Sequence, residues 1–335
     1  MGPDEHVSGV HSQACSARAV PDIIYDYMVE TDFWAGEALT LDIPDCQLIG
    51  SNSSPTHSSL ARRRHPVNRN QQIVRILFAT GMMSVGVLVL VYGYAVLLFQ
   101  PAPPAWAGWL KPVGYASGII LFGTGVGLLF ERSARLSTRI LLPFALLWLL
   151  TRLPAVPADP LREISWFAVG EVAVPFAGAL ALFTWLADTS SGSKLHRVAA
   201  THGLTIAQIL LGLSLLTFGL SHFFEFAART VSLVPPWLPY RTAWADLAGA
   251  AQIAAGLGVL FSIYPRWAAA AEAAMLSVFT VLVWIPAVIT KPGLASNWVE
   301  FVFTWALAGA CWVVAESIPA KGSRMVDRSG QPVGA

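Results

Sequence analysis

Eight apolar runs, each close to the length that crosses a bilayer, constrain the fold of this chain more than any other feature. They cover approximately residues 72–98, 113–131, 137–157, 165–187, 203–225, 243–263, 267–289 and 297–317. Only 12% of the residues are charged, and 55% are hydrophobic. Soluble domains carry roughly twice that share of charge. The sequence therefore predicts an all-α polytopic membrane protein with eight transmembrane helices.

Lysine and arginine are distributed unequally between the two sides that eight spans create. The side of both termini holds fourteen of them, namely Arg62, Arg63, Arg64, Arg69, Arg75, Arg132, Arg135, Arg139, Lys194, Arg197, Arg266, Lys321, Arg324 and Arg328. The opposite side holds six, namely Lys111, Arg152, Arg162, Arg229, Arg241 and Lys291. The positive-inside rule then predicts an inner (plasma) membrane protein with both termini in the cytoplasm. The polar residues 1–70 are expected to form a disordered cytoplasmic tail, and residues 319–335 a second tail.

An internal repeat relates the first four runs to the last four. An offset of 131, rising to 132 after one inserted residue, aligns Gly81/Gly212, Gly118/Gly249, Gly125/Gly256, Arg135/Arg266, Pro154/Pro286 and Trp166/Trp298. The predicted organisation is two tandem four-helix bundles, a first repeat at 71–188 and a second at 203–318, joined by a cytoplasmic linker at 189–202. Because each repeat has an even number of spans, the two run parallel, which counts against an inverted-repeat transporter.

The second repeat contains a series of short motifs in a fixed order. They are Gly219-Leu220-Ser221-His222-Phe223, Pro235-Pro236-Trp237-Leu238-Pro239, a glycine- and alanine-rich segment at 249–256 around Gln252, Pro265-Arg266, and Trp284-Ile285-Pro286-Ala287-Val288-Ile289. Over about 90 residues this order and spacing resemble the DoxX family of small four-helix membrane proteins. Gln252 stands where that family usually has a glutamate. The first repeat has Val91 where His222 falls and Leu121 where Gln252 falls, so it is expected to keep the fold without the polar centre.

The resemblance implies a range of functions rather than one. Some DoxX-like proteins are membrane subunits linked to thiosulfate:quinone or other quinone-coupled oxidation, and others assist the maturation of redox enzymes. Quinone is the one cofactor that this implies, and the sequence leaves open whether the chain is itself an enzyme. Cys15, Cys46 and Cys311 have no metal-ligand spacing, so no metal site is expected and electrons would come from an external partner protein. No basic, aromatic surface for nucleic acid is present.

His222 and Glu225 are the candidate catalytic residues. Their spacing of three predicts one helix face at the outer end of the fifth run, where they suit a proton relay or hydrogen bonds to a quinone carbonyl. The alternative is a solvated pair at the membrane rim, satisfied by water and by Arg229 or Arg241.

Gln252 and Trp284 are the candidate quinone contacts in the second repeat. Alternatively, Gln252 makes a plain interhelical hydrogen bond, and Trp284 belongs to an interfacial aromatic belt with Trp237 and Trp298. In the first repeat, Arg152 is expected to extend its side chain to the aqueous interface, or else to pair with Glu171 or an anionic ligand.

Three functions stay open from the sequence. The first is a DoxX-like membrane subunit of a quinone-linked redox system, with its polar site at the outer side of the second repeat. The second is a non-catalytic scaffold or assembly factor for another enzyme, for which helix packing alone suffices. The third is a transporter of a small solute.

Overall fold

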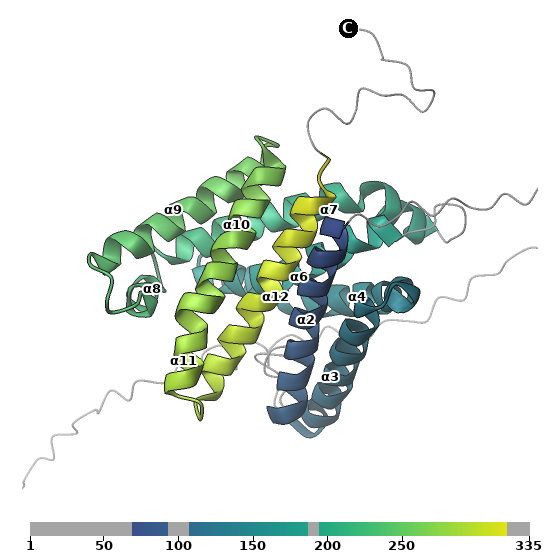
Figure 1. Ribbon diagram of the computed structural model, residues 1–335, viewed down its shortest axis with the longest axis horizontal. Coiled ribbons are helices and arrows are strands. Elements are labelled where there is room, and N and C mark those ends of the chain that lie inside the picture. The colour runs from purple at the N-terminus through teal and green to yellow at the C-terminus, as the bar shows by residue number, and fades with distance from the viewer. Residues whose placement is uncertain (1–68, 93–106, 187–193, 320–335) are drawn as a thin grey trace, which may run out of the picture. The chain divides into compact units, whose positions relative to one another are not determined.

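The computed structural model describes residues 69–92, 107–186 and 194–319, and the predicted tails lie almost wholly outside these ranges. Eight helices among these residues are long and apolar enough to cross a membrane, and none of the described residues forms a strand. The prediction of an all-α polytopic membrane protein is confirmed. The helices described below belong to one compact unit from residue 108 onward together with α2 (Arg69–Tyr92) (Figure 1).

Each repeat contains four long helices and short connecting elements. The first consists of α2 (Arg69–Tyr92), α3 (Ala107–Leu129), α4 (Glu131–Arg152), α5 (Ala155–Ala158) and α6 (Glu163–Leu186). The second consists of α7 (Lys194–Ser221), α8 (Ala227–Leu233), α9 (Arg241–Leu260), α10 (Pro265–Phe279), the π-helical turn η2 (Thr280–Trp284), α11 (Ile285–Thr290) and α12 (Ala295–Ser317). Two helix boundaries differ from the predicted ones. The linker 189–202 overlaps α7, which starts at Lys194, and the fifth helix ends at Ser221 rather than near 225.

The π-helical turn explains why the offset between the repeats changes from 131 to 132. In the second repeat the third span is interrupted by η2 at Thr280–Trp284, whereas the matching span of the first repeat is the uninterrupted α-helix α4. A π-helical turn bonds residue i to i+5 and so holds one more residue than an α-helical turn. The residue inserted in the second repeat is therefore absorbed as a π bulge next to Pro286.

The two repeats interlock through their first and fourth helices. α2 of the first repeat packs along α12 of the second, and α7 of the second packs along α6 of the first. α6 and α12, the two most buried spans, also pack against each other. Within the second repeat, the matching contact of α7 with α12 is slight. The two predicted tandem four-helix bundles therefore exchange one contact, because the first helix of each repeat packs on the fourth helix of the other.

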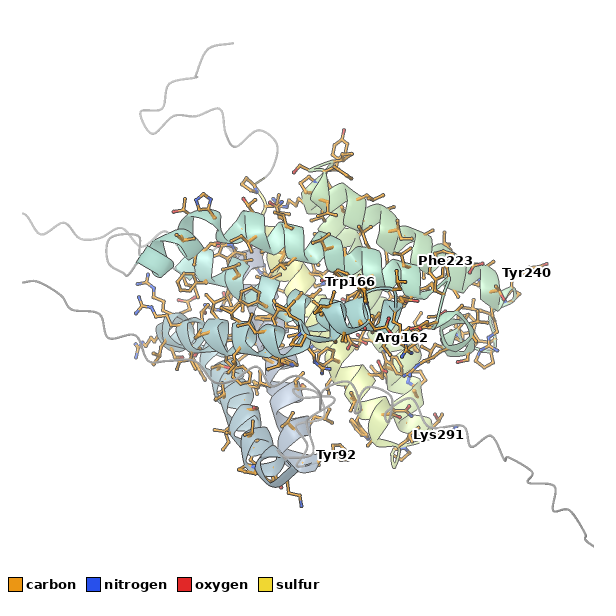
Figure 2. The ribbon with its side chains drawn as sticks, turned by 180° about the vertical axis from the view of Figure 1, so that it is seen from behind. Tyr92, Arg162, Trp166, Phe223, Tyr240 and Lys291 are labelled. Atoms are coloured by element: carbon orange, nitrogen blue, oxygen red, sulfur yellow. The ribbon has the colours of Figure 1, made fainter. Side chains whose placement is uncertain are left out.

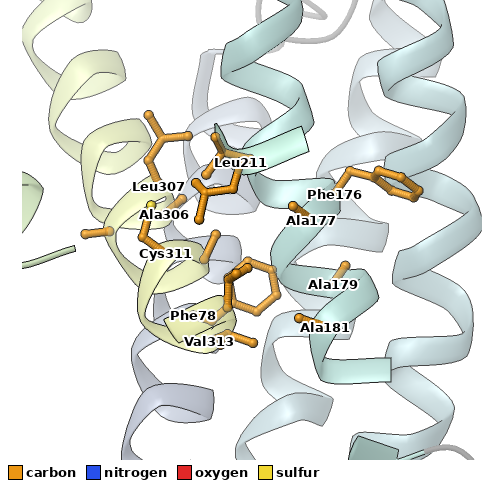
Figure 3. Close-up of a cluster of buried hydrophobic side chains, with 14 of the residues drawn as sticks. Phe78, Phe176, Ala177, Ala179, Ala181, Leu211, Ala306, Leu307, Cys311 and Val313 are labelled. Atoms are coloured by element: carbon orange, nitrogen blue, oxygen red, sulfur yellow. The ribbon is translucent and has the colours of Figure 1, made fainter. Parts of the chain in front are cut away.

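Glycines allow the backbones of α2, α6 and α12 to approach closely at the centre of this arrangement. A Cβ added to Gly309 would lie 2.7 Å from the Cα of Phe78, and one added to Gly81 would lie 2.6 Å from the Cα of Ala306. Gly178 meets Ala310 in the same way. The core around this junction combines alanines with larger apolar side chains, including Phe78 and Phe176 (Figure 3). In a bilayer, where apolar surface gains little from association, close backbone packing is what holds helices together.

The first two helices of each repeat also meet through glycine, and their contacts correct the alignment of the repeats. Gly118 faces the carbonyl oxygen of Gly86, as Gly249 faces that of Gly219. These first helices therefore match with an offset of 133, not 131. The residue of the first repeat that corresponds to His222 is Val89, which is buried, and not Val91, which is 70% exposed.

Candidate functional site

The chain leaves the helix at His222, so the predicted helix face shared with Glu225 does not exist. The last helical residue of α7 is Ser221. The amides of His222 and Phe223 donate to the carbonyls three residues earlier, Gly219 and Leu220, at 3.3 and 2.9 Å. Such bonds tighten and close a helix end. We call the end of the molecule where α7 ends and α9 begins the α8 end. Figure 2 labels Phe223 there, together with Arg162 of the first repeat.

His222 is half-buried and is held by the backbone of α9. Its Nδ1 lies 2.8 Å from the carbonyl oxygen of Ala245. A carbonyl oxygen only accepts hydrogen bonds, so Nδ1 carries the proton, and in the neutral ring Nε2 is left as an acceptor. Burial lowers the pKa of His222, against the smaller opposing effects of the Ala245 hydrogen bond and the charge of Asp246. The imidazole is therefore neutral at pH 7.

Glu225 and Glu163 tie the two repeats together through reciprocal hydrogen bonds at the α8 end. The carboxylate of Glu225 accepts from the amide of Ile164, in the first turn of α6, at 3.2 Å. The carboxylate of Glu163 accepts from the amide of Glu225 at 3.0 Å. Arg162 adds an ion pair to Glu225, with 3.4 Å between Nε and Oε1. Glu225 therefore caps a helix N-terminus, where a carboxylate is stabilising.

We expect Glu225→Gln to have a small effect on stability. The amide oxygen still accepts from Ile164, but the pairing with Arg162 and with the positive end of α6 is lost. Since this pair is partly exposed, the free energy of unfolding should fall by about 0.5–1 kcal/mol, measured by thermal unfolding in detergent. Glu131→Gln, at an exposed α4 position, is the control. A loss far above that range would mean that Glu225 does more than cap α6.

A second set of charges joins the repeats deeper at the same end. Arg229 donates to Glu300 at 2.6 Å, linking α8 to α12. The carboxyl of Glu171, on α6, interacts electrostatically with Arg152, Arg229 and Glu300. Arg152 is half-buried rather than extended into solvent, and its interaction with Glu171 is electrostatic.

Gln252 makes a buried hydrogen bond away from His222. Its Nε2 donates to Oε1 of Glu272 on α10 at 3.2 Å, and the two residues are only 4% and 1% exposed. Gln252 lies seven residues beyond Ala245 on α9, which is about 10 Å along the helix axis. Within the described residues, no hydrogen bond joins Gln252 to His222 or Glu225. The predicted site is thus divided into a histidine at the α8 end and a buried amide–carboxyl pair within the membrane span.

The buried pair is specific to the second repeat. The offset of 131 places Leu121 at the position of Gln252 and Leu141 at the position of Glu272, and both leucines are at most 1% exposed. The same fold is therefore built once with two leucines and once with two polar residues. Buried polar groups are costly in a bilayer and are commonly functional.

Sequence reasoning missed Glu272, and the signal was available. It is the only charged residue in the apolar run 267–289, and an ionisable residue at membrane depth is a functional candidate by default. Trp284, the other candidate quinone contact, is 7% exposed and ends the π-helical turn, so the alternative of a place in an interfacial belt is wrong. Trp298 and Trp166, in contrast, donate to the carbonyls of Pro292 and Pro160, both at 2.9 Å, which is a matched pair of loop contacts in the two repeats.

Arg75 does not have the exposed position expected of a cytoplasmic anchor. It is 2% exposed on α2, and its Nε and Nη2 have no hydrogen-bond partner among the described residues. No group of three or more His, Cys, Asp or Glu side chains in the described part of the chain could hold a metal ion.

Comparisons with known proteins give one match. A family model described as "Domain of unknown function (DUF8561)" matches residues 211–308, which include most of the second repeat with His222, Gln252 and Glu272. No curated protein matches the chain. No solved structure matches it either.

Proposed function

We propose that the chain is a DoxX-like membrane subunit of a quinone-linked redox system, and that it binds a quinone head group at the α8 end of the second repeat. In an inner membrane, the distribution of lysine and arginine supports an orientation with this end facing outward. The residue proposed to contact the quinone is His222. Electrons would come from an external partner protein.

The hydrogen bond from His222 Nδ1 to the Ala245 carbonyl is the observation that carries this proposal. It fixes the ring and leaves Nε2 as an acceptor for a quinol hydroxyl, with a neutral imidazole as the proton acceptor. Apolar side chains that flank His222 and Ala245 in the sequence, Phe223, Phe224 and Trp244, are 43–63% exposed and would contact a lipophilic ring. The first repeat has a buried valine, Val89, at the equivalent position, so the fold does not require a histidine here.

The test is the quinone content of protein purified in mild detergent. We expect near-equimolar quinone in wild type and a loss of about ten-fold or more in His222→Ala, since ten-fold corresponds to about 1.4 kcal/mol of binding free energy. His202→Ala is the matched control, because His202 lies on the same helix, is exposed, and is near its opposite end. It should retain the wild-type content.

Equal trace amounts of quinone in all three proteins would contradict quinone binding by this chain. The non-catalytic scaffold would then be favoured, because the capping role of Glu225 and the ion pair of Arg229 need no ligand. Pull-down of partner proteins with wild type and His222→Ala would follow, and a scaffold should retain its partners in both. Uptake of a solute by liposomes would instead favour a transporter.

A further inference from the structure

A second polar centre lies in the second repeat at a distance from His222, and its chemistry differs. Gln252 and Glu272 face each other between α9 and α10, and each leaves one buried oxygen unsatisfied. These are Oε1 of Gln252 and Oε2 of Glu272. Buried polar atoms are nearly always hydrogen-bonded, so two orphans in one pair need an explanation.

A single proton satisfies both orphan oxygens. If Oε2 of Glu272 is protonated, its O–H can donate to Oε1 of Gln252 while Nε2 of Gln252 donates to Oε1 of Glu272. The pair then becomes a cyclic amide–acid pair with two hydrogen bonds. If Glu272 is ionised, both unsatisfied oxygens are acceptors, and no hydrogen bond can form between them.

The surroundings favour the neutral acid. α9, α10 and α12 are the elements that pack around Glu272, and the side chains that interact with it are Gln252 of α9 and the buried thiol of Cys311 of α12. No cation of the described residues interacts with it. The nearest basic residue on its own helix, Arg266, donates to Glu316 at 2.7 Å. An unpaired carboxylate in an apolar interior costs far more than a protonated one.

We propose that Glu272 and Gln252 form a proton-binding site within the membrane span of the second repeat. Glu272 holds a dissociable proton on Oε2, and Gln252 is the residue that positions it. Release converts Oε2–H to the carboxylate and a free proton, and it breaks the bond to Gln252 Oε1. The two oxygens then repel each other, so proton release is coupled to a change in the contact between α9 and α10. This site does not depend on a quinone at His222.

The direct test is infrared spectroscopy of the full chain in detergent or lipid, in which a protonated carboxyl has its own C=O stretch. We expect that band at neutral pH, where exposed carboxyls are ionised. The difference spectrum between wild type and Glu272→Gln should contain the Glu272 contribution to that band, and Glu316→Gln, whose carboxyl is paired with Arg266, should retain it. In Gln252→Leu the band should shift to higher frequency, because the C=O loses its hydrogen bond. That shift keeps the test valid if Glu272→Gln does not fold.

Two results would overturn the proposal. One is a spectrum of wild type at neutral pH without the protonated carboxyl band, or with a band that is unchanged in Glu272→Gln and Gln252→Leu. The other is loss of the band on adding sodium chloride at constant pH but not on adding choline chloride, which would make this a sodium site rather than a proton site.

Discussion

The double variant Gln252→Leu with Glu272→Leu is expected to insert and unfold like wild type. The single variant Gln252→Leu is expected to be less stable. The single change leaves the Glu272 carboxyl, 1% exposed, without its hydrogen-bond donor. An unsatisfied buried polar group costs about 1–3 kcal/mol. The double variant removes both polar groups and recreates the Leu121 and Leu141 arrangement of the first repeat.

The measurement is a double-mutant cycle on the free energy of unfolding in a fixed detergent. The coupling energy between the two positions should exceed about 1 kcal/mol, as for residues in direct contact. The first repeat offers a matched control, since Leu121→Gln alone should be destabilising by a similar mechanism. Simple addition of the two single effects at 252 and 272 would show that the pair does not act as a unit.

Gly309→Ala is expected to be strongly destabilising. The new Cβ would lie 2.7 Å from the Cα and 2.9 Å from the N of Phe78, so α2 and α12 must separate. These atoms belong to backbone and cannot move aside as a side chain would. Overpacking of this kind costs about 1–3 kcal/mol, and here it also weakens the contact between the two repeats.

Gly123→Ala is the control for that substitution, because a Cβ at Gly123 meets nothing within 4 Å. In a helix, alanine is favoured over glycine by up to about 1 kcal/mol, so this variant should be neutral or slightly more stable. Thermal unfolding of both variants in the same detergent gives the comparison. Equal shifts in the two proteins would mean that the close approach at Gly309 does not hold α2 on α12.

Helix number and the repeat followed from the sequence because both depend on local signals. The length of an apolar run decides whether a helix spans the membrane, and spaced glycines such as Gly249 and Gly256 mark helix contacts, which the structure confirms. The change of offset also predicted a one-residue insertion in the second repeat, which the structure contains as the π-helical turn η2. The sequence did not show which helices pack against each other. A repeat shows which helices are alike, but not that α2 covers α12 and α7 covers α6.

The candidate site was only partly predictable for a similar reason. His222 and Gln252 were found because each interrupts an apolar pattern, but their separation depends on which neighbour each one bonds. The carbonyl of Ala245 holds His222 at the helix end, and Glu272 holds Gln252 on another helix. Glu225 resembled a catalytic acid because the sequence cannot show that the amide of Ile164, 61 residues away, lies beside it.

The central claim is that His222 of the second repeat serves quinone binding, and that neither His222 nor the Gln252–Glu272 pair is needed for folding. The most direct test replaces all three with their counterparts in the first repeat, giving His222→Val, Gln252→Leu and Glu272→Leu in one chain. Quinone content is then measured per folded protein, with the unfolding temperature recorded on the same preparation. The account predicts a wild-type or higher unfolding temperature and no bound quinone. Wild-type quinone content in this folded variant would contradict it.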